Sequence, residues 1–167
     1  MANKAIASIN VEVLPDDMRF NIVGENNFDI VNEITASSGD GWVYGTKPIS
    51  TSSIDLIEAT DDYIKTDFDG VVNTSDKIPW IAIKHTGTKE GYSPTNNGLC
   101  IAPNETAAHT LTNGIYLEPG ELIILKLPNC TVADLHCITV TMSNGKPTAV
   151  GSTDVYVKFA AILQNVG

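Results

Sequence analysis

Lys77-Ile-Pro-Trp-Ile-Ala-Ile-Lys84 is the first of three apolar segments that decide the fold of this chain. The other two are Glu121-Leu-Ile-Ile-Leu-Lys-Leu127 and Leu135-His-Cys-Ile-Thr-Val-Thr141, and loops rich in Gly, Pro, Asn and Thr lie between the segments. Short apolar runs that are bounded by turn residues are typical of antiparallel strands. The three segments therefore predict a β-sandwich, and they say much more about architecture than about chemistry.

Further strand-like segments extend this pattern along the whole chain. In Ala5–Leu14, Ile9, Val11 and Val13 alternate with polar residues, and turn signals at 24–27 and 37–41 bound the next segments. The remaining expected strands cover 18–23, 28–35, 42–46, 51–60 (for which a short helix is the alternative), 99–102, 113–117 and 153–163. Short strands at roughly 8–12-residue spacing predict an antiparallel, jelly-roll-like β-sandwich. We expect a single all-β domain over residues 1–167, with residues 1–14 as an N-terminal strand or contact arm.

Composition limits the partners of this chain. It has 167 residues with 43% hydrophobic and 18% charged residues, which suits a domain with a real core, and no apolar run approaches the roughly 20 residues of a membrane helix. The N-terminus lacks the apolar stretch of a secretory signal, so we expect synthesis in the cytoplasm. The net charge of −10 and the single arginine, Arg19, argue against nucleic-acid binding, which needs clustered positive charge.

The three cysteines, Cys100, Cys130 and Cys137, lie in or beside apolar segments, and their odd number suits buried thiols better than a disulfide framework. Zinc would need these thiols together with histidines, yet no Cys-x-x-Cys or His-x-x-x-His pair occurs. Such a site would have to be assembled from His85, His109, His136, Cys130 and Cys137 by long-range folding. We expect no metal and no cofactor.

Residues 61–76 form the most acidic part of the chain, so we compare them with a calcium-binding loop. Asp67, Asp69, Gly70 and Asp76 match positions three, five, six and twelve of an EF-hand loop, but the first position is Lys65 and the flanks are strand-like. A solvated acidic loop is the simpler interpretation. Whether this segment binds a cation stays open.

No catalytic motif stands out. There is no Gly-x-Ser-x-Gly, no phosphate-binding glycine loop and no dinucleotide fingerprint. Glu118 and Glu121 flank Pro119-Gly120 and would be the candidate carboxylate pair of a glycosidase, although an acidic chain shows such pairs in ordinary turns. We expect a protein that is not an enzyme.

Four aromatic residues, Trp42, Tyr44, Trp80 and Tyr92, are candidates for a contact surface. Trp80 follows Pro79 in an apolar strand and is expected in the core. Trp42, Tyr44 and Tyr92 remain as exposed candidates for a partner or for stacking on a sugar, because aromatic residues often mark contact surfaces.

Three segments carry a resemblance to a known class of proteins. They are Ile81-Ala-Ile-Lys-His-Thr-Gly87, Ile115-Tyr-Leu-Glu-Pro-Gly-Glu121 with Lys126-Leu-Pro128, and Val155-Tyr-Val-Lys-Phe-Ala160. With this order of strands, His-Thr-Gly loop and Pro-Gly turn, about the last 90 residues of the chain resemble small virion structural proteins of tailed phages. The motifs are packing and turn signals, so no active-site residues come with them.

The resemblance implies a capsid decoration or cement protein on the outer surface of a phage head, or a tail or fibre-associated component. Its partner would be the major capsid protein, and a homo-oligomer is expected, with a trimer as our first choice and a monomer as the alternative. A carbohydrate-binding or adhesive β-sandwich is the second reading, and it needs Trp42, Tyr44 and Tyr92 to converge on one surface. A β-sandwich hydrolase is the third.

Overall fold

The computed structural model describes residues 5–13, 20–28, 41–59, 64–66, 71–89, 92–104, 114–144, 146–150 and 154–166, with backbone alone for 5–13, 20–28 and 64–66. The chain divides into two compact units, Met1–Ile34 and Thr35–Gly167. No α-helix occurs among the described residues, and one 3₁₀ turn spans Val132–Asp134.

The first unit contains a two-stranded antiparallel hairpin. Strand β1 (Ala5–Val13) pairs with β2 (Phe20–Phe28), and the register runs from Ala5 opposite Phe28 to Val13 opposite Phe20. The expected N-terminal strand is therefore present. The turn expected at 24–27 is wrong, because these residues lie within β2 and pair with β1. Residues 29–35 of the next expected strand lie outside the described residues.

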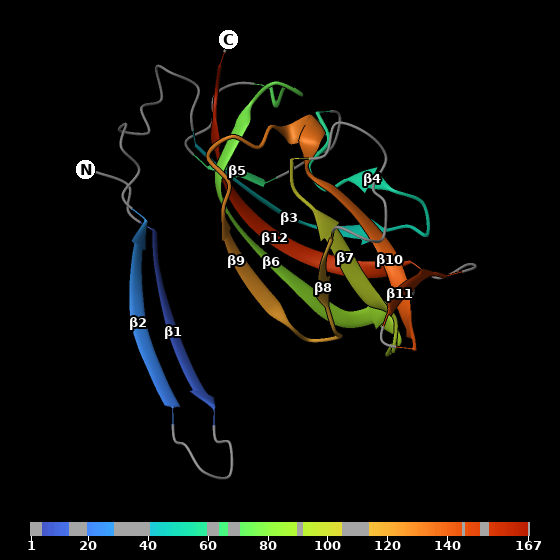
Figure 1. Cartoon of the computed structure of the whole chain (residues 1–167). Helices are drawn as coiled ribbons and strands as arrows, with labels where there is room; N and C mark the ends of the chain where they lie inside the picture. Colours follow the sequence, from blue (N-terminus) through green and yellow to red (C-terminus); the bar gives the residue numbers. More distant parts are fainter. Residues whose placement is uncertain are drawn as a thin grey trace. The chain divides into compact units, whose positions relative to one another are not determined.

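The second unit begins with a five-stranded antiparallel sheet, here called the β12 sheet, in the order β5-β3-β12-β6-β9. Its central strand, β12 (Val155–Gln164), lies between β3 (Gly41–Ile49) and β6 (Lys77–Lys89). The edges are β5 (Ile64–Thr66) and β9 (Leu122–Lys126). Figure 1 shows β3, β12, β6 and β9 side by side in this order.

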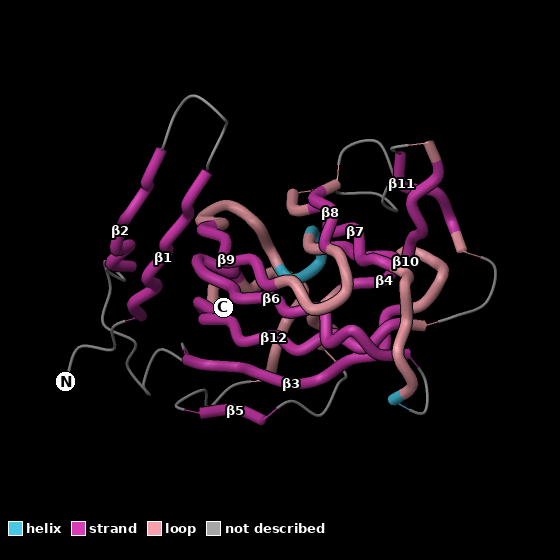
Figure 2. The backbone as a smooth tube through the Cα atoms, turned by 90° about the horizontal axis from the view of Figure 1, so that it is seen from below, coloured by secondary structure: helices cyan, strands magenta, loops and turns pink. Residues whose placement is uncertain are grey.

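The opposing β10 sheet follows the order β11-β10-β7-β8, and β4 also pairs with β10. Its strands are β4 (Ile54–Asp55), β7 (Gly98–Ala102), β8 (Ile115–Leu117), β10 (His136–Ser143) and β11 (Lys146–Ala149). Strand β4 pairs with the start of β10 and β11 with its end, both on the edge that β7 does not use. The two sheets form two layers in Figure 2.

The strand order is that of a jelly roll. When the strands of the second unit are counted from β3 without β5 and β11, the β12 sheet holds the first, eighth, third and sixth strands, and the β10 sheet holds the second, seventh, fourth and fifth. All the pairings are antiparallel. The predicted all-β, jelly-roll-like sandwich is confirmed.

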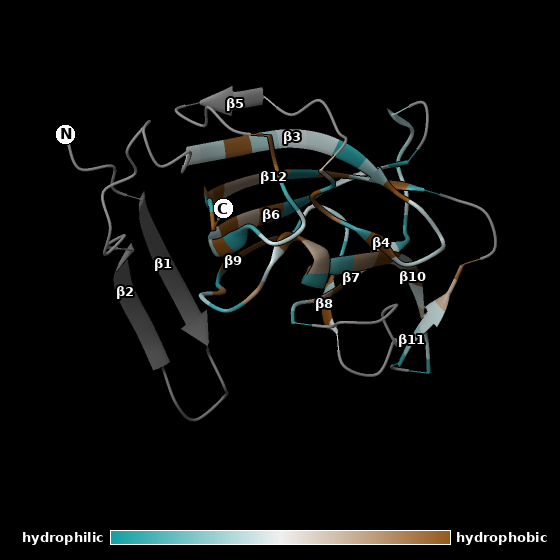
Figure 3. Ribbon diagram, turned by 90° about the horizontal axis from the view of Figure 1, so that it is seen from above, coloured by the Kyte–Doolittle hydropathy of each residue, from teal (hydrophilic) through white to brown (hydrophobic). Residues whose placement is uncertain are grey.

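The core lies between the two sheets because alternate residues of the facing strands are apolar. The β12 sheet contributes Val43, Ile49, Ile81, Ile83, Val155, Val157, Phe159, Ala161 and Leu163, and the β10 sheet contributes Leu99, Ile101, Leu117 and Cys137. The apolar colour along β12 and β6 in Figure 3 follows this layer. Residues between these positions point to the outer faces, which are the surfaces available for function.

Two local expectations need correction. Among the described residues 51–59 of the strand expected over 51–60, only Ile54 and Asp55 form a strand, because the Ser50 hydroxyl closes a turn by donating to the Ser52 carbonyl (3.0 Å) and accepting from the Ser52 amide (3.1 Å). The loop expected over 86–98 is shorter than predicted, since β6 continues to Lys89.

Candidate functional site

The outer face of the β12 sheet is a regular grid of residues from four strands. One row runs Trp42, Ile162, Trp80 and Lys126; the next runs Tyr44, Ala160, Ala82 and Ile124; and the third runs Thr46, Lys158, Lys84 and Leu122. We call these twelve residues the β12 outer face. Its middle row is apolar across all four strands, and Tyr44 (40% exposed) and Leu122 (58%) present large apolar side chains to solvent.

The two tryptophans pack on each other on this face. Their ring centroids are 5.4 Å apart and the rings meet edge to face at 75°, with Ile162 between them in the row. Trp80 is buried as expected, but it lies on the side of β6 opposite to Ile81 and Ile83 of the core. Trp42 is half-buried in this contact, so its ring is mainly a packing element of the outer face.

Tyr44 and Tyr92 occupy different parts of the same sheet face. Tyr44 lies in the apolar row, while Tyr92 (73% exposed) stacks on Tyr156 of β12, with ring centroids 5.2 Å apart and planes at 13°. Tyr156 pairs with Pro48 on β3, four residues along from Tyr44, which corresponds to about 13 Å of strand. The predicted aromatic residues thus share a face without forming a single cluster. Sequence reasoning missed Tyr156.

Lys84 and Lys158 form the least expected feature of the β12 outer face. They lie directly opposite each other on β6 and β12, and both are exposed. Within the described part of the chain, neither lysine has an ion-pair partner. Like charges at directly opposed positions destabilise a sheet. The pair is unexpected because the chain has twice as many carboxylates (20) as basic residues (10), so a carboxylate opposite each lysine would be more common. The sequence alone does not reveal this pair, because it depends on the register.

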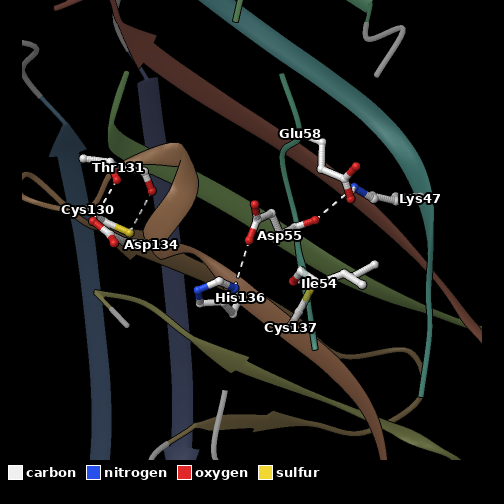
Figure 4. A network of polar contacts seen from close by, with 9 residues as sticks. All are labelled: Lys47, Ile54, Asp55, Glu58, Cys130, Thr131, Asp134, His136 and Cys137. Atoms are coloured by element: carbon white, nitrogen blue, oxygen red, sulfur yellow. Dashed lines mark hydrogen bonds and ion pairs between the residues drawn. The ribbon is translucent and has the colours of Figure 1, made fainter. Parts of the chain in front are cut away.

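A cluster of polar side chains, shown in Figure 4, lies where β3, β4 and β10 meet. His136 Nδ1 is 2.9 Å from Asp55 Oδ1, and these residues are opposed on β10 and β4. The second ring nitrogen of His136, Nε2, is buried and has no hydrogen-bond partner. A carboxylate that orients an imidazole supplies two of the three members of a hydrolytic triad, but Cys137, the adjacent potential nucleophile, belongs to the core.

Lys47 connects β3 to this group from the inner side of the sandwich. Its Nζ donates to the Asp55 carbonyl (2.9 Å) and to Glu58 Oε1 (2.6 Å). The Cys137 thiol donates to the Ile54 carbonyl (3.6 Å), and its burial raises its pKa despite the nearby positive charge of Lys47. A thiol with a raised pKa is a poor nucleophile. These contacts tie β4 to its neighbours.

Among the described residues, the members of the zinc set considered from the sequence do not come together. No group of three or more His, Cys, Asp or Glu side chains that could hold a metal occurs among the residues whose positions are described. His85 is fully buried, and all three cysteines are buried thiols with pKa values raised by burial. His109 lies outside the described residues.

The acidic segment is described only in part. Asp67, Asp69 and Gly70 lie outside the described residues, and only the backbone is described for Lys65. Asp76 is fully buried; its Oδ2 accepts a hydrogen bond from the Asn73 amide (2.8 Å) and its Oδ1 has no partner. Asp76 therefore closes a turn before β6.

Glu118 and Glu121 act together in a turn. The Glu118 amide donates to Glu121 Oε2 (2.7 Å), and the Glu121 amide donates to the Glu118 carbonyl (3.0 Å). Both residues are exposed at the β8–β9 connection. A carboxylate that caps its own turn has a structural task, so nothing in this geometry favours a glycosidase pair.

The β8–β9 turn docks on the His-Thr-Gly loop of β6. The His85 amide donates to the Glu121 carbonyl (2.9 Å) and the Gly120 amide donates to the His85 carbonyl (3.1 Å). The His85 ring accepts from the Gly87 amide at Nδ1 (2.9 Å), so Nε2 carries the proton and donates to the Asn97 carbonyl (2.9 Å). Gly87 (φ 77°) and Gly120 (φ 90°) adopt left-handed conformations that other residues rarely tolerate. We call this arrangement the His85 junction.

In comparisons with known proteins, no family model, no curated protein and no solved structure matches this chain. None of the helical segments in the described residues has the length and apolar character needed to cross a membrane.

Proposed function

We propose that this chain is a non-enzymatic structural protein that decorates and stabilises the capsid of a tailed phage by bridging neighbouring capsomers. The observation that carries the proposal is the His85 junction. The three segments that resemble phage virion proteins are far apart in sequence, yet β12, β6 and β9 are neighbours in one sheet and the Pro-Gly turn is hydrogen-bonded to His85. The resemblance thus describes one continuous part of the fold.

The fold and the charge support the same proposal. Both viral capsid domains and lectins use jelly rolls. The fold is therefore compatible with a role in a virion, but a fold alone does not assign a function. A net charge of −10 suits the outer surface of a shell, where the protein would not compete for the packaged genome. Bridging several capsomers would turn weak individual contacts into stable attachment.

The test is cosedimentation of the purified chain with expanded phage heads that lack their decoration protein. Saturable binding, with a copy number that matches a symmetry axis of the shell, is the expected result. Heads already covered by decoration protein serve as the control and should bind none. Failure to bind bare heads at micromolar concentrations would overturn the capsid proposal.

A carbohydrate-binding or adhesive module, including a tail or fibre component, is the second candidate. The Tyr92–Tyr156 stack favours it, because exposed rings can stack on sugars, whereas Trp42, Tyr44 and Tyr92 do not form the single cluster that this reading requires. Binding on a glycan array that Tyr92→Ala abolishes would support this candidate. Met142→Ala removes another exposed side chain (43%) from the other sheet and serves as the control.

A further inference from the structure

We propose that the open edge of β9 pairs with the β9 edge of a second copy of this chain, so that two β12 sheets join into one continuous sheet. The inference concerns self-association in solution and does not depend on the capsid proposal. In the described part of the chain, β9 pairs with β6 on one side and with no strand on its other side (Figure 1). An unpaired strand edge is a template for a further strand.

The sequence of β9 is that of an interior strand. Leu122-Ile-Ile-Leu125 is an unbroken apolar run, so both faces of the strand are apolar. Strands that are buried on both faces carry such runs, whereas edge strands are commonly protected by shortness, by lysine or by proline. The other described edge strands of the sandwich have this protection, since β4, β5 and β8 have only two or three residues and β11 begins with Lys146-Pro147.

The hydrogen bonds from β9 to β6 fix which backbone groups face the open edge. The Glu121 carbonyl accepts from the His85 amide (2.9 Å), and the Leu127 amide donates to the Pro79 carbonyl (3.1 Å). The backbone groups of alternate residues point to the same side of a strand, so the odd-numbered residues of β9 face β6. The even-numbered residues direct their amides and carbonyls to the open edge: Leu122, Ile124 and Lys126.

A twofold axis beside Ile124 gives these backbone groups a complete set of partners. When two antiparallel copies of β9 are centred on this residue, Ile124 lies opposite its own counterpart and Leu122 lies opposite Lys126 of the second copy. Every one of these opposed residues directs its amide and carbonyl to the open edge, so each pair can exchange both hydrogen bonds. Opposed residues share a face, so the outer faces of the two sheets lie on the same side.

The side chains of β9 gain from the same register. Leu122 is 58% exposed, and the aliphatic stem of Lys126 from the second copy would cover it. On the inner side, the partly buried Ile123 would lie opposite Leu125 of the second copy, and both would extend the core layer. On the outer side, the apolar row that ends at Ile124 would continue into the same row of the second copy.

This contact is closed after two copies. An isologous contact uses the same edge on both molecules, so a third copy finds neither β9 edge open. The contact gives a dimer, and the trimer expected from the sequence would need another surface. A strand of 5 residues buries a small area, so we expect a weak dimer that forms at micromolar or higher concentrations.

The experiment measures the mass of the full chain by sedimentation equilibrium as a function of concentration. Ile124→Lys should raise the dissociation constant of the dimer by at least about tenfold, because the twofold axis places two like charges directly opposite each other. Ile124→Glu should have the same effect for the same reason. An equimolar mixture of the two variants should regain the mass of the wild type, since opposite charges then meet at the axis.

Tyr44→Lys is the matched control. It introduces the same charge in the same apolar row, but on β3, which is three strand spacings or about 14 Å from β9. Edge pairing predicts that this variant keeps the dissociation constant of the wild type. If Tyr44→Lys and Ile124→Lys weaken the dimer equally, the copies associate through their outer faces and the edge proposal is wrong.

Amide hydrogen exchange gives a second readout. The amides of Leu122 and Ile124 should exchange faster as the wild-type chain is diluted, whereas those of Ile123 and Leu125 face β6 and should not respond. A wild-type chain that stays monomeric at millimolar concentration, or a mixture of the charged variants no heavier than its components, would overturn the proposal. Protection of the two edge amides that does not change with concentration would also overturn it, because the edge would then be closed within one chain.

Discussion

The ring of Tyr116 on β8 lies across the Cα of Gly98 on β7. A Cβ atom built at residue 98 would be 2.6 Å from both Cζ and the hydroxyl oxygen of Tyr116, closer than real Cβ atoms come to any neighbour. The contact lies on the outer face of the β10 sheet, where Cys100, Ile138 and Val140 form a small cluster against which Tyr116 packs. Gly98 is therefore needed for space and not for a special backbone angle.

Gly98→Ala should destabilise the chain by about 1–3 kcal/mol, because the added methyl displaces the Tyr116 ring from its place. Urea denaturation of the variant gives the value. The control is the same Gly98→Ala substitution made in a Tyr116→Ala protein. There the added methyl has room, so Gly98→Ala should lower the free energy of unfolding by less than about 0.5 kcal/mol. An equal cost in both backgrounds would show that the ring is not the cause.

Thr139→Val should cost about 1–3 kcal/mol. The fully buried Thr139 hydroxyl donates to the Ile49 carbonyl at 2.5 Å, and its amide donates to the Ser50 carbonyl at 2.9 Å, so this residue joins β10 to the end of β3. Valine keeps the shape and leaves the carbonyl without this donor. Thr139→Ser keeps the hydroxyl and loses a methyl group, so it should lower the free energy of unfolding less than Thr139→Val does. If chemical denaturation shows that Thr139→Ser is the more destabilising variant, the hydrogen bond to Ile49 does not have the proposed role.

Acid should weaken the His85 junction. Burial lowers the pKa of His85 below its usual 6.5, against a smaller opposing effect of the Asn97 carbonyl and of Glu121. The unfolded chain then binds a proton more readily, so the junction's contribution is complete above about pH 6.5 and is lost as the pH falls from there through the folded-state pKa. The free energy of unfolding should decline by up to about 1.4 kcal/mol per pH unit in that interval from this group.

His85→Asn isolates this titration, since an amide can still hydrogen-bond to Gly87 or Asn97 but does not titrate. The variant should be less stable at pH 7.5 and should show a shallower dependence of stability on pH below 6.5. Both chains are measured by urea denaturation at each pH. Parallel curves for the two proteins would assign the acid sensitivity to other groups.

The cysteines should be inert in the native protein. Cys100, Cys130 and Cys137 are buried, and burial raises the pKa of each thiol, so little thiolate is present at neutral pH. A colorimetric thiol reagent should react slowly with the native chain and should titrate three thiols in denaturant. Rapid reaction of one thiol in the native state would place that residue at the surface.

The sequence predicted the fold better than the make-up of the β12 outer face, for a physical reason. Ile81, Ile83 and the alternation of Val155, Val157 and Phe159 carry the period of two that a half-buried strand requires, and these residues do form the core. Gly24 and the residues that follow it look like a turn locally, yet pairing with β1 keeps them extended. Local preference lost to strand pairing there.

The β12 outer face was only partly visible in the sequence because it depends on register. The sequence predicts Trp42 and Tyr44 as surface candidates because aromatic residues often mark contact surfaces, but their neighbours Trp80, Ala160 and Lys158 come from strands 36 or more residues away. Trp80 was expected in the core and does lie buried, although against Trp42 and not between the sheets. A single sequence carries no signal for which positions become opposed.

The place of β12 has a consequence for synthesis. It follows every other described strand of the sandwich in chain order, yet it lies between β3 and β6, and Phe159 and Leu163 reach into the core from it. Until β12 has been synthesised, β3 and β6 have unpaired edges that face each other, the kind of surface that recruits other nascent chains. The sandwich can close only after translation has passed Gln164, so we expect ribosome-bound chains that stop before Val155 to be degraded by protease under conditions in which the released protein survives.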